Sequence, residues 1–106
     1  MVTFSIDLET NGLLGDPFIV STRVYSSDGT FLESFDGRCP IEGEIDSFVK
    51  EHVLPPNVDI VENYSSLLEL SKDFVEFYKK FPNKTVISHI PYPVESGYFL
   101  WLQHHK

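Results

Sequence analysis

Two carboxylates, Asp7 and Glu9, lie two residues apart near the start of the chain. They belong to residues 2–9 (VTFSIDLE), in which apolar and polar side chains alternate as in a β-strand with one buried face. This alternation places both carboxylates on the polar face, about 6.5–7 Å apart along the strand. Two negative charges held this close repel each other, and a divalent cation relieves the repulsion. The pair therefore predicts a site for Mg²⁺ or Mn²⁺ with coordination positions left open for substrate phosphates.

Two further strands are expected to hold the acid-bearing strand in a sheet. Residues 18–25 (FIVSTRVY) are rich in β-branched and aromatic side chains, as strands are. A Ser-Asp-Gly turn at residues 27–29 then predicts a hairpin that returns through residues 30–35 (TFLESF). The first three strands should form an antiparallel meander, and the strongly apolar strand 2–9 should be central.

Two helices are expected after the meander. Residues 46–54 predict a short helix with Asp46 or Ser47 as its N-cap, and two prolines follow it. Residues 66–69 (SLLE) form a capping box that begins a longer helix, which ends before Pro82. Its apolar side chains recur at helical spacing, so they are interpreted as core. They are Leu67, Leu70, Phe74, Phe77 and Phe81.

A fourth strand and a last helix complete the expected domain. Residues 85–90 (TVISHI) predict a short buried strand, parallel to the first because helices precede it. The last helix is expected from about Val94 to His104. No repeat, linker or low-complexity segment interrupts the chain, so residues 1–106 are interpreted as one domain.

The composition indicates a small acidic protein. With 106 residues and 42% hydrophobic side chains, the chain is expected to be globular. A net charge of −8 argues against a protein that holds nucleic acid mainly through a basic surface. Cys39 is the only cysteine and cannot form an internal disulfide, which is typical of a reducing compartment. We find no transmembrane run or signal peptide, and expect a cytoplasmic location without membrane association.

Residues 6–13 (IDLETNGL) resemble the first motif of the DEDD 3′–5′ exonucleases, a superfamily with an RNase H-like fold. The pattern Asp-x-Glu-Thr-x-Gly-Leu is more specific than two acids alone, for which the alternative is a solvated strand end. Residues 48–55 (FVKEHVLP) are similar to a segment of small bacterial 3′–5′ exoribonucleases of the mycobacterial type. The resemblance implies an α/β fold with an RNase H-like mixed sheet, in which a parallel fourth strand joins the antiparallel meander.

The resemblance also implies an activity. An exonuclease of this type removes nucleoside monophosphates from the 3′ end of RNA or single-stranded DNA with two divalent ions, Mg²⁺ or Mn²⁺. Asp7 and Glu9 would hold these ions. The turn that follows would bind the terminal nucleotide, with backbone groups on the ribose and a leucine against the base. The substrate-binding residues implied are Thr10, Asn11, Gly12 and Leu13.

Glu95 occupies the position of the family's second metal-binding acid, within residues 89–100 (HIPYPVESGYFL). The resemblance implies a catalytic metal ligand there. The alternative is a carboxylate in the first turn of a helix, where it complements the helix dipole. The family's third motif, a His or Tyr followed by an Asp, has no counterpart after Glu95. We therefore expect a nuclease domain truncated at its C-terminus, without its last strand and helix.

Two other functions stay open. A catalytically incomplete nuclease fold would act as a binding or assembly module, with a homo-oligomer formed through the exposed edge of the truncated sheet. A hydrolase that uses the Asp7 and Glu9 pair for acid–base chemistry is the third interpretation. The choice between RNA and DNA depends on contacts to the 2′-hydroxyl group.

Overall fold

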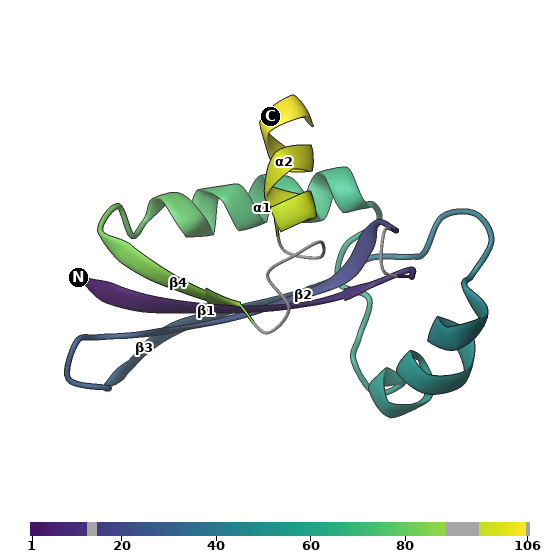
Figure 1. The fold of residues 1–106 in the computed structure, drawn as a ribbon, viewed down its shortest axis with the longest axis horizontal. Coiled ribbons are helices and arrows are strands. Elements are labelled where there is room, and N and C mark those ends of the chain that lie inside the picture. Colours follow the sequence, from purple (N-terminus) through teal and green to yellow (C-terminus); the bar gives the residue numbers. More distant parts are fainter. Residues whose placement is uncertain (13–14, 89–95, 106) are drawn as a thin grey trace.

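The fold is a four-stranded mixed sheet, seen in a computed structural model that describes residues 1–12, 15–88 and 96–105 (Figure 1). The strands are β1 (Val2–Thr10), β2 (Pro17–Tyr25), β3 (Phe31–Arg38) and β4 (Lys84–Ser88), in the order β3-β2-β1-β4. β1 pairs antiparallel with β2 and parallel with β4, and β2 pairs antiparallel with β3. The predicted α/β class, the meander, the parallel fourth strand and the interior position of β1 are confirmed.

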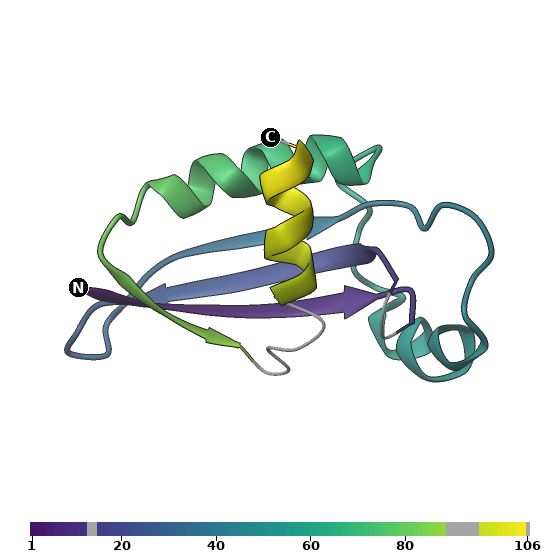
Figure 2. The same cartoon turned by 45° about the horizontal axis from the view of Figure 1, so that its top comes forward.

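Both long helices lie on the same face of the sheet. α1 (Leu67–Lys79) runs along the sheet and α2 (Ser96–His105) crosses it, as Figures 1 and 2 show from two directions. A buried hydrogen bond of 2.8 Å between the Ser71 and Tyr98 hydroxyls joins the two helices. Burial raises the pKa of Tyr98 to about 12. Among the described residues, the opposite face of the sheet carries no helix over its centre in either view.

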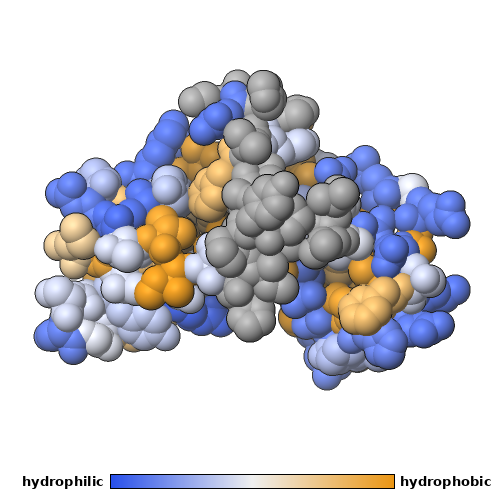
Figure 3. Space-filling model, in the orientation of Figure 1, coloured by the Kyte–Doolittle hydropathy of each residue, from blue (hydrophilic) through white to orange (hydrophobic). Residues whose placement is uncertain are grey.

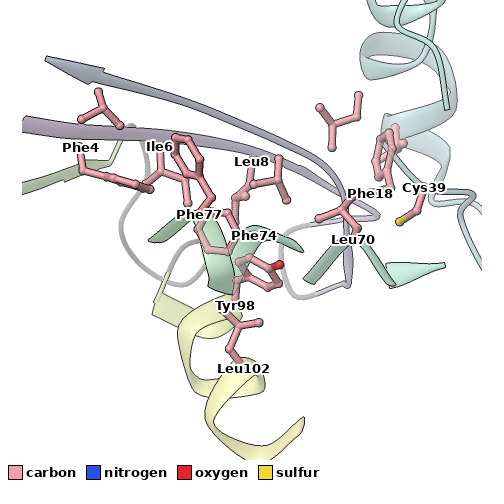
Figure 4. Close-up of a cluster of buried hydrophobic side chains, with 14 residues drawn as sticks. Phe4, Ile6, Leu8, Phe18, Cys39, Leu70, Phe74, Phe77, Tyr98 and Leu102 are labelled. Atoms are coloured by element: carbon pink, nitrogen blue, oxygen red, sulfur yellow. The ribbon is translucent and has the colours of Figure 1, made fainter. Parts of the chain in front are cut away.

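The core lies between β1 and the helices. Phe4 and Ile6 are fully buried and face α1, whose Phe74 is buried beside them, whereas the buried Leu70 of α1 lies near Phe18 and Cys39 (Figure 4). The Phe4 and Phe74 rings meet edge to face with centroids 6.3 Å apart, a favourable geometry for aromatic pairs. This packing confirms that the apolar stripe of α1 is core.

The start of α1 shows the predicted capping box. Ser66 Oγ accepts the backbone N–H of Glu69 at 3.1 Å, which satisfies one of the free donors of the first turn. The Glu69 carboxylate returns to the backbone N–H of Ser65 at 3.2 Å. The reciprocal bond therefore reaches one residue further back than in the usual box.

The predicted helix at residues 46–54 is confirmed in position, but most of it is wider than an α-helix. Asp46 is its N-cap, because Asp46 Oδ2 accepts the backbone N–H groups of Phe48 and Val49 at 3.1 and 3.3 Å. η1 (Val49–Val53) is a π-helical turn, closed by a 2.9 Å bond from the Leu54 N–H to the Val49 carbonyl. A 3₁₀ turn follows at once, η2 (Pro55–Asn57), where the two prolines end the helix.

β4 differs from its prediction as a buried strand. Within the described residues it pairs only with β1, so it is an edge of the sheet. Val86 and Ile87 are 37% and 52% exposed, and Figure 3 shows hydrophobic surface in the area where β4 lies. The prediction was wrong because an apolar strand sequence does not reveal whether a further strand covers it. His89 and Ile90, the rest of the predicted strand, lie outside the described residues.

Candidate active site on the open face of the sheet

β1 places both acids of the candidate metal site on the face away from the helices. Phe4, Ile6 and Leu8 are buried on the helix side, whereas Asp7 between them is exposed and Glu9 is half-buried. The predicted alternation is therefore confirmed from Phe4 to Glu9. A polar strand face that stays open is suited to binding a ligand from solvent, because no apolar layer has to be displaced.

Two neighbouring strands extend this polar face, as the strand register shows. Asp7 lies opposite Ser21 on β2, and Ser21 lies opposite Asp36 on β3, so the three side chains form one row across the sheet. In the next row Arg23 of β2 lies opposite Ser5. Arg23 Nη1 binds Asp36 Oδ1 at 2.9 Å, and this ion pair is about half exposed.

Sequence reasoning missed Ser21, Arg23 and Asp36. The third strand was expected to end at Phe35, but β3 continues to Arg38, and this continuation makes Asp36 a strand residue. The available signal was period two: Ser21 and Arg23 are polar interruptions of an otherwise apolar strand. Only the pairing register of β1, β2 and β3 shows that these residues lie near Asp7, and this register depends on the conformation of the turns between the strands.

A cleft of about 410 Å³ lies over β2 and β3. Asp7 does not line this cleft, but the strand register places it beside the lining residue Ser21, so we call it the cleft beside Asp7. Its floor comes from the two strands and its wall from the chain that follows η2. Ser21 belongs to this lining and is the cross-strand partner of Asp7, so their Cβ atoms should be about 4.5–5.5 Å apart. The lining residues are Ile19, Ser21, Arg23, Asp36, Gly37, Ile60, Val61 and Asn63.

Hydrogen bonds to β3 hold the wall of this cleft in place. The side chain of Asn63 accepts the backbone N–H of Arg38 at 2.8 Å and donates to the carbonyl of Asp36 at 3.0 Å, as a paired strand would. Arg38 Nη1 donates to the carbonyls of Asn57 and Ile60, at 2.5 and 3.0 Å. The wall of the cleft is therefore held to β3 at two places, by the hydrogen bonds of Asn63 and by those of Arg38.

The turn after β1 braces a neighbouring loop. The Asn11 side chain accepts the backbone N–H of Asp46 at 2.8 Å and donates to the carbonyl of Glu44 at 2.9 Å. Thr10 Oγ1 donates to the carbonyl of Gly12 at 2.6 Å, and Gly12 has φ +85°, a conformation that favours glycine. These contacts connect the acid-bearing strand to the N-cap of η1. The implied roles of Thr10, Asn11 and Gly12 toward a ribose stay predictions.

The predicted metal site is represented among the described residues by two carboxylates, Asp7 and Glu9. Carboxylate oxygens are the donors that Mg²⁺ and Mn²⁺ prefer, and the Asp7 and Glu9 pair fits such an ion in its chemistry. Within residues 1–12, 15–88 and 96–105, however, no three His, Cys, Asp or Glu side chains are grouped so that they could hold a metal ion. Glu95 and Leu13, the other two predicted site residues, lie outside the described residues.

Cys39 is buried in the core and is expected to be unreactive in the folded protein. Burial, together with the negative charges of Glu42, Glu62 and Asp16, raises the pKa of its thiol to about 11. Because the unfolded chain loses this proton near pH 9, the free energy of unfolding should fall as pH rises from about 9 to about 11. Urea denaturation across this range checks the slope. Cys39→Ala should reduce it, and an unchanged slope would contradict the assignment.

Comparisons with protein families, with characterised proteins and with solved structures find no match to this chain. None of the helices in the described part of the structure is long and apolar enough to span a membrane.

Proposed function

We propose that this chain is a metal-dependent nuclease domain that removes nucleotides from the 3′ end of RNA or single-stranded DNA. The observation that carries the proposal is the position of Asp7 and Glu9, side by side on the open face of an interior strand. A sheet that combines an antiparallel meander with a parallel fourth strand is what an RNase H-like nuclease would need. The cleft beside Asp7 supports it further, because a substrate strand has to lie next to the acids.

The roles of the residues follow from this proposal. Asp7 and Glu9 supply carboxylate oxygens to the divalent ions, and Glu95 is proposed as a third acid. When bound, such ions activate water and stabilise the leaving 3′-oxygen of a phosphodiester. Asn11 holds the turn after β1 through its side-chain hydrogen bonds to the backbone of Glu44 and Asp46, so the acid-bearing strand ends in a fixed geometry.

The test is a cleavage assay with labelled single strands. With a 5′-labelled RNA or DNA oligonucleotide and Mn²⁺, we expect a ladder of products that shorten from the 3′ end. A chelator should abolish the ladder, and a 3′-phosphate on the substrate should delay its appearance. Products that begin in the middle of the strand, or no products with either nucleic acid, would contradict the proposal.

A catalytically incomplete nuclease fold is the second candidate. It is favoured by the finding that the described residues contain no group of three or more metal ligands. The exposed apolar side chains of the edge strand β4 would then serve assembly, including formation of a homo-oligomer. This candidate predicts that Mn²⁺ binds without any product in the same assay.

A further inference from the structure

We propose that the cleft beside Asp7 binds one nucleotide unit of the substrate strand, with Arg23 on its phosphate and Ile60 and Val61 against its base. This inference rests on the proposed function, and it assigns a second subsite next to the metal-binding acids. The volume of the cleft, about 410 Å³, falls within the roughly 300–1,000 Å³ that is typical of small-molecule binding sites.

Arg23 is the cation of this cleft, and part of its guanidinium is available. Nη1 donates to Asp36 Oδ1 at 2.9 Å and to the carbonyl of Thr22 at 2.8 Å, which occupies both of its hydrogens. Nε and Nη2 carry the other donors of the planar fork, and within the described residues they make no hydrogen bond in the structure. This fork matches the oxygen spacing of a phosphate, and the side chain is 45% exposed.

The wall of the cleft is apolar, in contrast to the charged Arg23 on its floor. Ile60 and Val61 are exposed apolar side chains, with Val61 at 76%, although they line a hollow with a polar floor. The hydrogen bond from Arg38 Nη1 to the carbonyl of Ile60 holds this wall in place. An apolar wall facing a cation suits a ligand with a flat apolar part and an anionic part, the two halves of a nucleotide.

The strand register places the cleft next to Asp7. Arg23 lies two residues from Ser21, the cross-strand partner of Asp7, so it is a diagonal neighbour of Asp7 at about 7–8 Å. A nucleotide in the cleft would therefore sit one unit away from a phosphodiester held at Asp7 and Glu9. Asp36 lowers the attraction for a phosphate because it neutralises Arg23.

Asp36 provides a test of this inference, because substitutions of Arg23 and Asp36 should change nucleotide affinity in opposite directions. Arg23→Gln and Asp36→Asn break the same ion pair and change the shape of the cleft little. If Arg23 binds phosphate, Arg23→Gln should weaken adenosine 5′-monophosphate binding about fivefold, as expected of a half-exposed charge-assisted contact. Asp36→Asn should strengthen it, because a repulsive charge is lost. Adenosine, which has no phosphate, should bind equally to both variants and to the unchanged protein.

Affinities measured by titration in a chelator make the result independent of bound metal. Equal ratios of nucleotide to nucleoside affinity in the unchanged protein and Arg23→Gln would overturn the inference. The same holds if both variants are folded and both bind the nucleotide more weakly, or if the unchanged protein does not bind the nucleotide. Thermal denaturation of each variant confirms that it is folded. Failure of the proposed function appears separately, as no 3′ shortening in the cleavage assay.

Discussion

Replacement of Phe4 by alanine is expected to lower the free energy of unfolding by about 3–5 kcal/mol, the usual cost of removing a buried aromatic ring. Phe4 is fully buried on the interior strand, and its ring lies 5.2–6.4 Å from four other aromatic rings. These rings come from α1 and the chain just after it. A cavity at Phe4 would therefore weaken the packing of the sheet against this helix. A domain of this size is stabilised by only about 5–15 kcal/mol, so the loss is large. Urea denaturation followed by circular dichroism measures it.

Phe48→Ala is the matched control, because the same ring is removed from a side chain that is 63% exposed. We expect a change within about 0.5 kcal/mol, as for other surface substitutions. Similar losses in both variants would mean that the interface between β1 and α1 is not the main core of this domain.

The sequence predicted the main elements because local rules and the core agree there. β1 alternates strictly, and its apolar half is the half that α1 buries. Ser66 was identifiable as an N-cap, and Asp46 as one of two candidates with Ser47, because short polar side chains that precede an apolar periodic segment commonly cap a helix. In each case one signal determined both the local conformation and the side that faces the core.

The edge strand and the π-helical turn could not be predicted in the same way. The exposure of Val86 and Ile87 depends on which strand pairs with β4, and that is a property of the whole sheet. η1 widens where residues 49–53 lead into two prolines, and the sequence signal for a short helix is the same for both helix types. The exposure of β4 and the helix type of η1 were therefore determined by contacts with other parts of the fold and not by local sequence.

The candidate site was predictable only along one strand. Asp7 and Glu9 follow from period two, which needs no knowledge of neighbouring strands. Arg23 and Asp36 join them through pairing across two strand boundaries, and Ile60 and Val61 through bonds that return the chain to β3. A single sequence carries no direct signal for such contacts between distant segments.

Asp7→Asn is expected to reduce Mn²⁺-dependent cleavage by at least about 100-fold, because groups that merely orient metal ligands already contribute about 10–100-fold. The amide keeps the size of the side chain but removes the negative charge that the ion requires. Folding should be nearly unaffected, because Asp7 is exposed and one of two neighbouring negative charges is lost. The measurements are the rate of 3′ shortening and the denaturation midpoint with and without Mn²⁺. In the unchanged protein Mn²⁺ should raise that midpoint, since a ligand that binds only the folded state stabilises it.

Asp59→Asn supplies the control for charge alone, because Asp59 is also exposed and lies outside β1. Both variants change the net charge by one unit, so a general electrostatic effect on nucleic acid would appear in both. A specific metal site predicts that only Asp7→Asn loses cleavage and the Mn²⁺-dependent rise in midpoint. If Asp7→Asn kept the rise but lost cleavage, Asp7 would act on the substrate and not on the ion. If it kept both, Asp7 would be an ordinary solvated residue, and the nuclease proposal would lose the observation on which it depends.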